Sequence, residues 1–131
     1  MKKIVVIDDE IAVAKSGAAM LRFRGYSPEI ATSGLEGIEL VNRIDPQLVI
    51  TDMRMPLVTG EDVFHALRAS PRTFNIPVLI ISAYGWEHCK EAGDAHLQKP
   101  FRVNELLRMV ESLIAPLHDT ECSQPPFALG R

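Results

Sequence analysis

The segment Ile4-Val5-Val6-Ile7-Asp8-Asp9-Glu10, at residues 4–10, decides the fold, because four β-branched apolar residues run directly into three acids. An unbroken run of this kind suits a strand that is covered on both faces, which is the pattern of parallel sheets. The runs at 48–50 and 78–81 have the same character, and each also ends at a polar residue. With two weaker candidates at 28–31 and 95–97, the sequence predicts five strands.

Segments with a helical spacing of apolar residues separate the predicted strands. Two of them open with a capping-box pattern, in which an acid follows a hydroxyl residue by three positions: Ser33 with Glu36, and Thr59 with Asp62. The longer predicted helices span residues 11–24, 33–44, 59–69 and 103–113. This alternation predicts an α/β fold, a doubly wound five-stranded parallel sheet with helices on both faces and right-handed crossovers.

Length and composition limit the domain organisation and the function class. The chain has 131 residues, 47% of them hydrophobic, and a net charge of −3 with scattered bases. We expect one domain at 2–115, a tail or linker start at 116–131, and no direct nucleic-acid binding by this domain. The apolar run at 4–7 is too short for an export signal or a membrane span, so we expect a cytoplasmic protein.

Polar side chains follow the strands of the predicted sheet at the edge where ligands bind in such folds. They are Asp8, Asp9, Asp52, Ser82 and Lys99. Two carboxylates ~4 Å apart repel by about 4 kcal/mol at an effective dielectric constant of 20, so we expect a divalent cation to neutralise them. Carboxylate oxygens suit Mg²⁺, which is usually shared with a phosphate. One carboxylate can act as a nucleophile and form an aspartyl phosphate.

Five separated motifs in this order resemble the receiver domain of two-component response regulators. The motifs are Ile7-Asp8-Asp9-Glu10, Thr51-Asp52-Met53-Arg54-Met55-Pro56, Gly60, Ser82-Ala83 and Lys99-Pro100-Phe101. The resemblance covers about residues 2–115. It implies a chemotaxis-regulator-like (βα)5 fold with the flavodoxin-like strand order 2-1-3-4-5.

The resemblance also implies a role for each residue of the acidic site. Asp52 would be the phosphoacceptor. Asp9 and Asp52 would hold Mg²⁺ together with the backbone carbonyl of Arg54, and Asp8 would act mainly through water. Lys99 would pair with the phosphoryl oxygens.

Further implied roles concern the response to phosphorylation. Ser82 would be the switch hydroxyl that moves to the phosphoryl group, and His96 lies where the family usually has an aromatic switch residue. Conversion of the acceptor to an acyl phosphate changes its charge from −1 to about −2, which attracts this hydroxyl. Arg54 and Tyr84 flank the site and either tune dephosphorylation or are solvent-facing loop residues. Pro100 would follow a cis peptide bond.

One interval departs from the family pattern. Ser82 and Lys99 are 17 positions apart, shorter than in most receivers by roughly five residues, which is more than one helical turn. We therefore expect a shortened fourth helix of one or two turns at 86–92, or irregular chain there. The shortening puts dimerisation through the usual face of the fourth and fifth βα units in doubt.

These observations favour a phosphoryl-accepting signalling switch over the alternatives. A sensor histidine kinase or phosphotransfer protein would donate the group, and a downstream protein or a fused output domain would receive the signal. The chain would not be an enzyme beyond catalysing its own phosphorylation and dephosphorylation. One alternative is a pseudo-receiver that docks partners without phosphorylation. A haloacid-dehalogenase-type phosphatase is not supported, because Arg54 stands where that class has a second Asp. A dinucleotide-binding domain is not supported either, because no G-x-G-x-x-G motif follows the first predicted strand.

Overall fold

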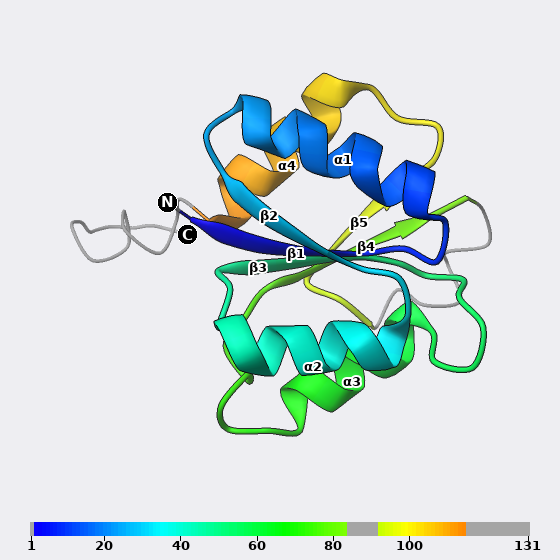
Figure 1. Cartoon of the computed structure of the whole chain (residues 1–131), viewed down its shortest axis with the longest axis vertical. Helices are drawn as coiled ribbons and strands as arrows, with labels where there is room; N and C mark the ends of the chain where they lie inside the picture. Colours follow the sequence, from blue (N-terminus) through cyan, green and yellow to red (C-terminus); the bar gives the residue numbers. More distant parts are fainter. Residues whose placement is uncertain (1, 84–91, 115–131) are drawn as a thin grey trace.

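The computed structural model describes residues 2–83 and 92–114. Strands and helices alternate along the chain (Figure 1), in the order β1 (Lys3–Ile7), α1 (Ile11–Phe23), β2 (Ser27–Ala31), α2 (Gly34–Ile44), β3 (Leu48–Asp52), α3 (Gly60–Arg68), β4 (Val78–Ser82), β5 (Ala95–Gln98) and α4 (Val103–Ile114). The predicted strands and the four longer helices are therefore confirmed, with the last of these helices labelled α4. The short helix predicted at 86–92 falls, except for Ala92, outside the described residues, as does the tail predicted at 116–131.

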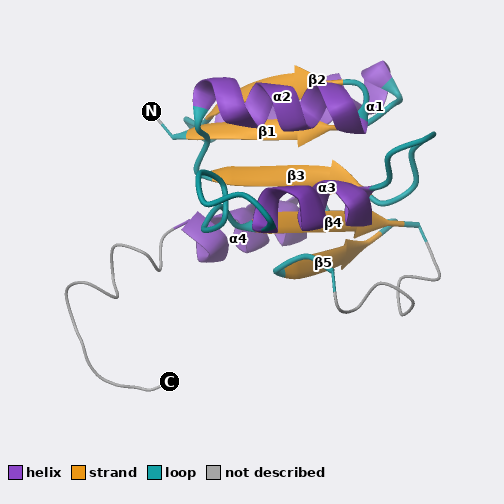
Figure 2. Ribbon diagram, turned by 90° about the horizontal axis from the view of Figure 1, so that it is seen from below, coloured by secondary structure: helices purple, strands orange, loops and turns teal. Residues whose placement is uncertain are grey.

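The five strands form one parallel sheet in the order β2-β1-β3-β4-β5, which confirms the implied strand order. The register pairs Ile7 with Thr51, and Asp52 with Ile81. All strand arrows point the same way in Figure 2. The carboxyl ends of β1, β3 and β4 consequently meet at one edge, and the side chains that follow them are brought together.

Helices cover both faces of the sheet, α1 and α4 on one side and α2 and α3 on the other (Figure 1). Successive residues of β1 alternate between the two cores: Ile4 and Val6 pack on the face of α1 and α4, and Val5 and Ile7 on the opposite face. All four are buried. This explains why the strand is apolar at every position, since burial of each such side chain contributes roughly 1.5–3 kcal/mol.

The two predicted capping boxes form differently. At the start of α3, the Thr59 hydroxyl accepts the Asp62 N–H at 3.1 Å and the Asp62 carboxylate accepts the Thr59 N–H at 2.9 Å, so this box is complete. At α2, the Ser33 hydroxyl accepts the Glu36 N–H at 3.1 Å. The Glu36 carboxylate instead accepts the N–H and hydroxyl of Thr32, at 2.8 and 3.0 Å. The prediction of a two-sided box at Ser33 was therefore wrong, because Thr32 offers the acid two donors.

The apolar residues at 11, 14, 18 and 21 recur with helical spacing, which predicts one buried stripe on α1, and this prediction needs a correction at its first position. Ala14, Ala18 and Leu21 are buried, as their spacing predicts. Ile11, which we placed in the same stripe, is 48% exposed. It is the first residue of α1, and the buried face of the helix begins one turn later at Ala14.

An ion pair that the sequence did not indicate links α3 to the start of β4 and β5. The Asp94 carboxylate binds the Arg68 guanidinium and accepts the Val78 N–H at 2.7 Å. Arg68 also donates to the carbonyl of Ile76 at 2.9 Å and lies over the Phe64 ring at 4.7 Å. These contacts hold the chain where it enters β5. That strand begins at Ala95, four positions before Lys99.

Among the described residues, no helix combines the length and the apolar character that a bilayer crossing requires.

Candidate functional site

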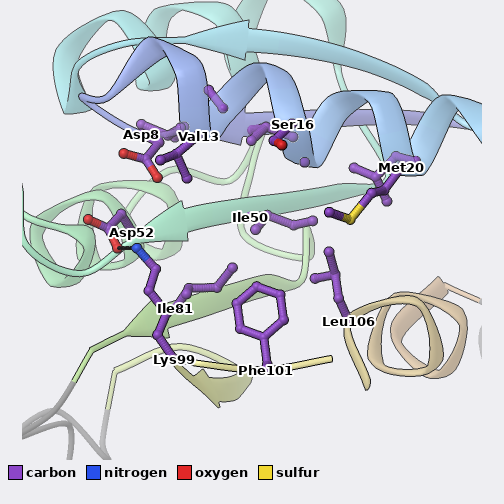
Figure 3. Close-up of a pocket in the computed structure, with 15 residues that line it drawn as sticks. Asp8, Val13, Ser16, Met20, Ile50, Asp52, Ile81, Lys99, Phe101 and Leu106 are labelled. Carbon is purple, nitrogen blue, oxygen red and sulfur yellow. Dashed lines mark ion pairs between the residues drawn. The ribbon is translucent and has the colours of Figure 1, made fainter. Parts of the chain in front are cut away.

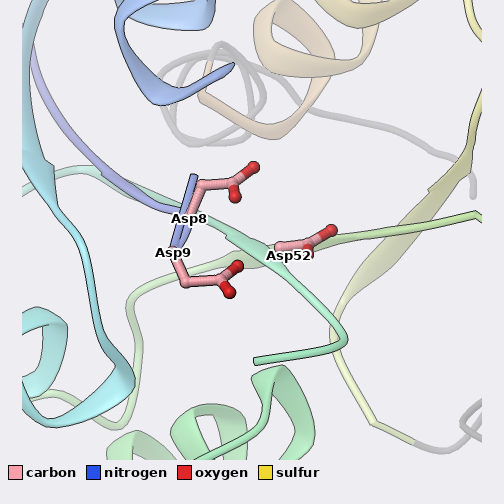
Figure 4. Close-up of side chains that lie close together, drawn as sticks. All are labelled: Asp8, Asp9 and Asp52. Atoms are coloured by element: carbon pink, nitrogen blue, oxygen red, sulfur yellow. The ribbon is translucent and has the colours of Figure 1, made fainter. Parts of the chain in front are cut away.

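Three carboxylates converge at the carboxyl edge of the sheet (Figure 4). Asp8 and Asp9 follow β1, and Asp52 is the last residue of the neighbouring strand β3. One oxygen of each carboxylate lies within 4.8 Å of the others. Asp8 is 7% exposed and the Asp52 side chain 14%, whereas Asp9 is exposed. The sheet thus brings together all three acids that the sequence placed at strand ends.

The backbone holds these acids in place. The N–H of Asp8 donates to the carbonyl of Ala31 at 3.1 Å, and its Oδ1 accepts the N–H of Glu10 at 3.0 Å. On the far side of Asp52, α3 begins so close to β3 that a Cβ on Gly60 would lie 2.5 Å from the carbonyl oxygen of Asp52. Glycine at position 60 is therefore required by this close approach.

Lys99 and Ser82 complete the cluster from β4 and the segment after β5. The Nζ of Lys99 lies 3.4 Å from Oδ1 of Asp52. The backbone N–H of Lys99 donates to the carbonyl of Ser82 at 2.8 Å, which places the two residues side by side. Ser82 is 4% exposed. The Lys99–Pro100 peptide bond is cis, as the resemblance implies.

Burial dominates the electrostatics of the site. It raises the pKa of Asp52, against the lowering effect of Lys99, and neighbouring Asp8 and Asp9 raise it further. Burial likewise raises the pKa of Asp8, against the lowering effect of its hydrogen bond with the Glu10 backbone. Both carboxylates are therefore less stable as anions than free ones. This set of hard oxygen donors, short of positive charge, fits a divalent cation such as Mg²⁺.

The remaining predicted residues lie around this cluster. Arg54 is exposed in the loop between β3 and α3. His96 is partly buried in β5, where it pairs in register with Ile80. Tyr84 falls outside the described residues. The roles given to these three residues stay predictions.

A cavity of about 120 Å³ adjoins the acids, and the sequence did not predict it. It lies between α1, β3 and the segment from Lys99 to α4, with Asp8, Asp52 and Lys99 at one end (Figure 3). The only sequence signal is the concentration of small residues in α1, including Ala14 and Gly17. Small side chains on a helix face leave space against the neighbouring elements.

The response regulator receiver domain family matches this chain over residues 4–111. That is most of the 131 residues, and the fold and the acidic edge agree with it. The chain belongs to this family, whose members are signalling switches of two-component systems rather than conventional enzymes.

Two curated relatives illustrate the match. The chain is 35% identical over 142 residues to the DNA-binding dual master transcriptional regulator RpaA of Synechocystis sp., covering 98% of this chain and 59% of the relative. It is 34% identical over 117 residues to the response regulator MprA of Mycobacterium leprae, covering 86% of this chain and 50% of the relative. The chain thus spans between half and three fifths of the length of these relatives.

A solved structure with the same architecture is the receiver domain of the sensor histidine kinase PA1611 from Pseudomonas aeruginosa. It superposes with a TM-score of 0.81 at 25% identity, covering 87% of this chain and 98% of the other. That structure has a magnesium ion coordinated in its active site cleft.

Proposed function

We propose that this chain is a phosphoryl-accepting switch in which Asp52 takes a phosphoryl group from a histidine kinase or a phosphotransfer protein. The observation that supports this proposal most strongly is the position of Asp52. Its carboxylate lies within 4.8 Å of the Asp8 and Asp9 carboxylates and 3.4 Å from Lys99 Nζ. A nucleophile, a set of cation ligands and a fixed ammonium group are the components that phosphoryl transfer requires.

In the transfer step, an oxygen of ionised Asp52 attacks the phosphorus of a phosphohistidine. The new O–P bond forms as the P–N bond breaks, and the departing imidazole nitrogen keeps the bonding electrons and takes a proton from solvent. Lys99, already paired with Asp52, is placed to bind the phosphoryl oxygens as the negative charge increases. Its attraction also favours the ionised form of Asp52 that the attack needs.

The same site fits Mg²⁺. We assign Asp9, Asp52 and the backbone carbonyl of Arg54 as its direct ligands, with Asp8 acting mainly through water. When bound, the ion offsets the charge that the carboxylates and the phosphoryl oxygens share. The magnesium in the related PA1611 receiver domain supports this assignment.

The switch side of the proposal rests on Ser82 and His96. Ser82 lies beside Lys99 and is almost fully buried, so a move toward a phosphorylated Asp52 would change packing at the end of β4. His96, on the adjacent strand β5, would follow into the released space. Arg54 and Tyr84 would tune the lifetime of the phosphorylated form. A local charge change would in this way alter a surface that partners bind.

The partners follow from the same role. A downstream protein or a fused output domain would receive the signal, and the greater length of RpaA and MprA supports an output region. RpaA is a DNA-binding regulator, but we assign no direct nucleic-acid binding to this domain because its bases are scattered. We place the protein in the cytoplasm, and its only catalysis is its own phosphorylation and dephosphorylation.

Intact-mass measurement after incubation with acetyl phosphate and Mg²⁺ tests the proposal. We expect the parent chain to gain one phosphoryl group, and the gain to disappear in Asp52→Asn and in the presence of EDTA. The matched variant Glu39→Gln removes one exposed carboxylate from α2 and should be labelled like the parent. Failure to label the parent under conditions that label another receiver would overturn the proposal and favour the pseudo-receiver alternative.

A further inference from the structure

The cavity behind the acidic site has the size and chemistry of a small-ligand site. Its volume is about 120 Å³, comparable with apolar protein cavities of roughly 150 Å³ that take up benzene. Apart from the charged end, most of its lining side chains are aliphatic or aromatic: Val13, Met20, Leu21, Ile50, Ile81, Phe101 and Leu106. Figure 3 shows Phe101 and Ile50 directed into the space, with Met20 and Leu106 at the end far from the acids.

The sequence of α1 keeps this space open. No heavy atom of the described residues, apart from its own helix neighbours, lies within 4 Å of the position that a Cβ on Gly17 would take. Gly17 lies in the middle of α1, where glycine is a poor helix former. A larger side chain at this position would strengthen the helix and fill the cavity.

Charge distinguishes the two ends of the cavity. Asp8 and Asp52 line one end together with Lys99, and Asp9 lies next to them. Three carboxylates against one ammonium repel an anionic ligand when no cation is bound, whereas among the described residues Met20 and Leu106 give the opposite end an apolar lining. This distribution of charge suits a ligand whose ring lies among the apolar side chains and whose polar substituent points toward the acids.

From this geometry we propose that the cavity between α1, β3 and α4 binds a neutral single-ring aromatic molecule. Burial of the ring against Ile50, Phe101 and Leu106 provides the affinity, and the carboxylates select against anions. Because Asp52 and Lys99 both line the cavity, a bound molecule lies next to the acidic site. The binding itself requires no phosphorylation.

Titration with benzyl alcohol, followed by methyl NMR of the isoleucines in the whole chain, tests this proposal. We expect saturable shifts with a Kd on the order of 1 mM. Ile50 and Ile81, which line the cavity, should move. Ile38 and Ile76, in the core on the other face of the sheet, should not. In EDTA, where no divalent cation offsets the carboxylates, benzoate, with a similar ring and a negative charge, should bind at least tenfold more weakly.

Variants of α1 show whether the shifts come from this cavity. Gly17→Leu should weaken benzyl alcohol binding at least tenfold, while Ala19→Leu, at an exposed position outside the cavity, should leave it unchanged. Val13→Phe is a second variant that fills the cavity. Because Val13 is 41% exposed, the larger side chain should be tolerated, and this variant replaces Gly17→Leu if that one fails to fold. Absence of saturable shifts, equal binding of benzoate, or undiminished binding in the filled variants would overturn the proposal.

Discussion

Replacement of the acceptor by its amide, Asp52→Asn, should stabilise the protein when no divalent cation is present. The variant keeps the shape of the side chain and removes its charge. Burial raises the pKa of Asp52, which means that the folded protein holds the anion less favourably than the unfolded chain does. The amide is free of this penalty.

The magnitude follows from the distances in the site. The carboxylate oxygens lie within 4.8 Å of one another, and at that separation and an effective dielectric constant of 20 a pair of carboxylates repels by about 3.5 kcal/mol. Lys99, at 3.4 Å, attracts Asp52 by about 5 kcal/mol on the same scale. Because Asp9 and Lys99 are partly solvated, both effects are screened, and burial adds to the repulsion. We therefore expect the free energy of unfolding to rise by about 1–2 kcal/mol.

Urea unfolding at pH 7 in EDTA measures this change, with Glu39→Gln as the control, which should stay within about 0.5 kcal/mol of the parent. The expected gain corresponds to a Tm higher by about 4–8 °C. Because the folded-state pKa of Asp52 is raised, the parent gains stability as pH falls through that pKa toward 3.8. The advantage of the variant should shrink over the same range. A variant less stable than the parent at pH 7 in EDTA would show that the folded protein does not disfavour the Asp52 anion.

Three further predictions concern the scaffold, and each is checked by urea unfolding. Gly60→Ala should destabilise the protein by about 1–3 kcal/mol because the added Cβ meets the backbone of β3. Gly17→Ala, where a Cβ has open space, should stabilise the protein by about 0.5–1 kcal/mol. If Gly17→Ala proved the less stable of the two variants, the packing described for these positions would be wrong. Thr59→Ala should cost about 1 kcal/mol through loss of the capping box, and an unchanged midpoint would show that the cap is dispensable. Asp94→Ala should cost about 1–3 kcal/mol because it leaves the Arg68 guanidinium and the Val78 N–H without their carboxylate acceptor, and an unchanged midpoint would show that the ion pair contributes nothing.

The fold was largely predictable because its signals are local. The apolar run at 4–7 and the acids after it place a buried strand and its end, and both follow from residues adjacent in the sequence. The capping box at Thr59 formed as predicted for the same reason. At Ser33 the prediction failed because a competing pair of donors on Thr32 became available only in the folded turn.

The candidate site was predictable in its membership but not in its surroundings. Strand order brings Asp8, Asp9 and Asp52 to one edge, so their convergence follows once the sheet is assigned. The contact of Arg68 with Asp94 spans 26 positions, and no pattern of charges in the sequence indicates such a pair. The cavity depends on how α1 and α4 sit over the sheet, which sequence spacing does not specify.

Identification of the phosphorylated residue tests directly whether Asp52 accepts the phosphoryl group. The chain is incubated with acetyl phosphate and Mg²⁺ and then treated with borohydride, which reduces an aspartyl phosphate to homoserine, before peptide mass spectrometry. We expect homoserine at position 52, with Asp8 and Asp9 unchanged. Homoserine at another position, or none in a chain that has gained a phosphoryl group, would contradict the assignment of Asp52 as the acceptor.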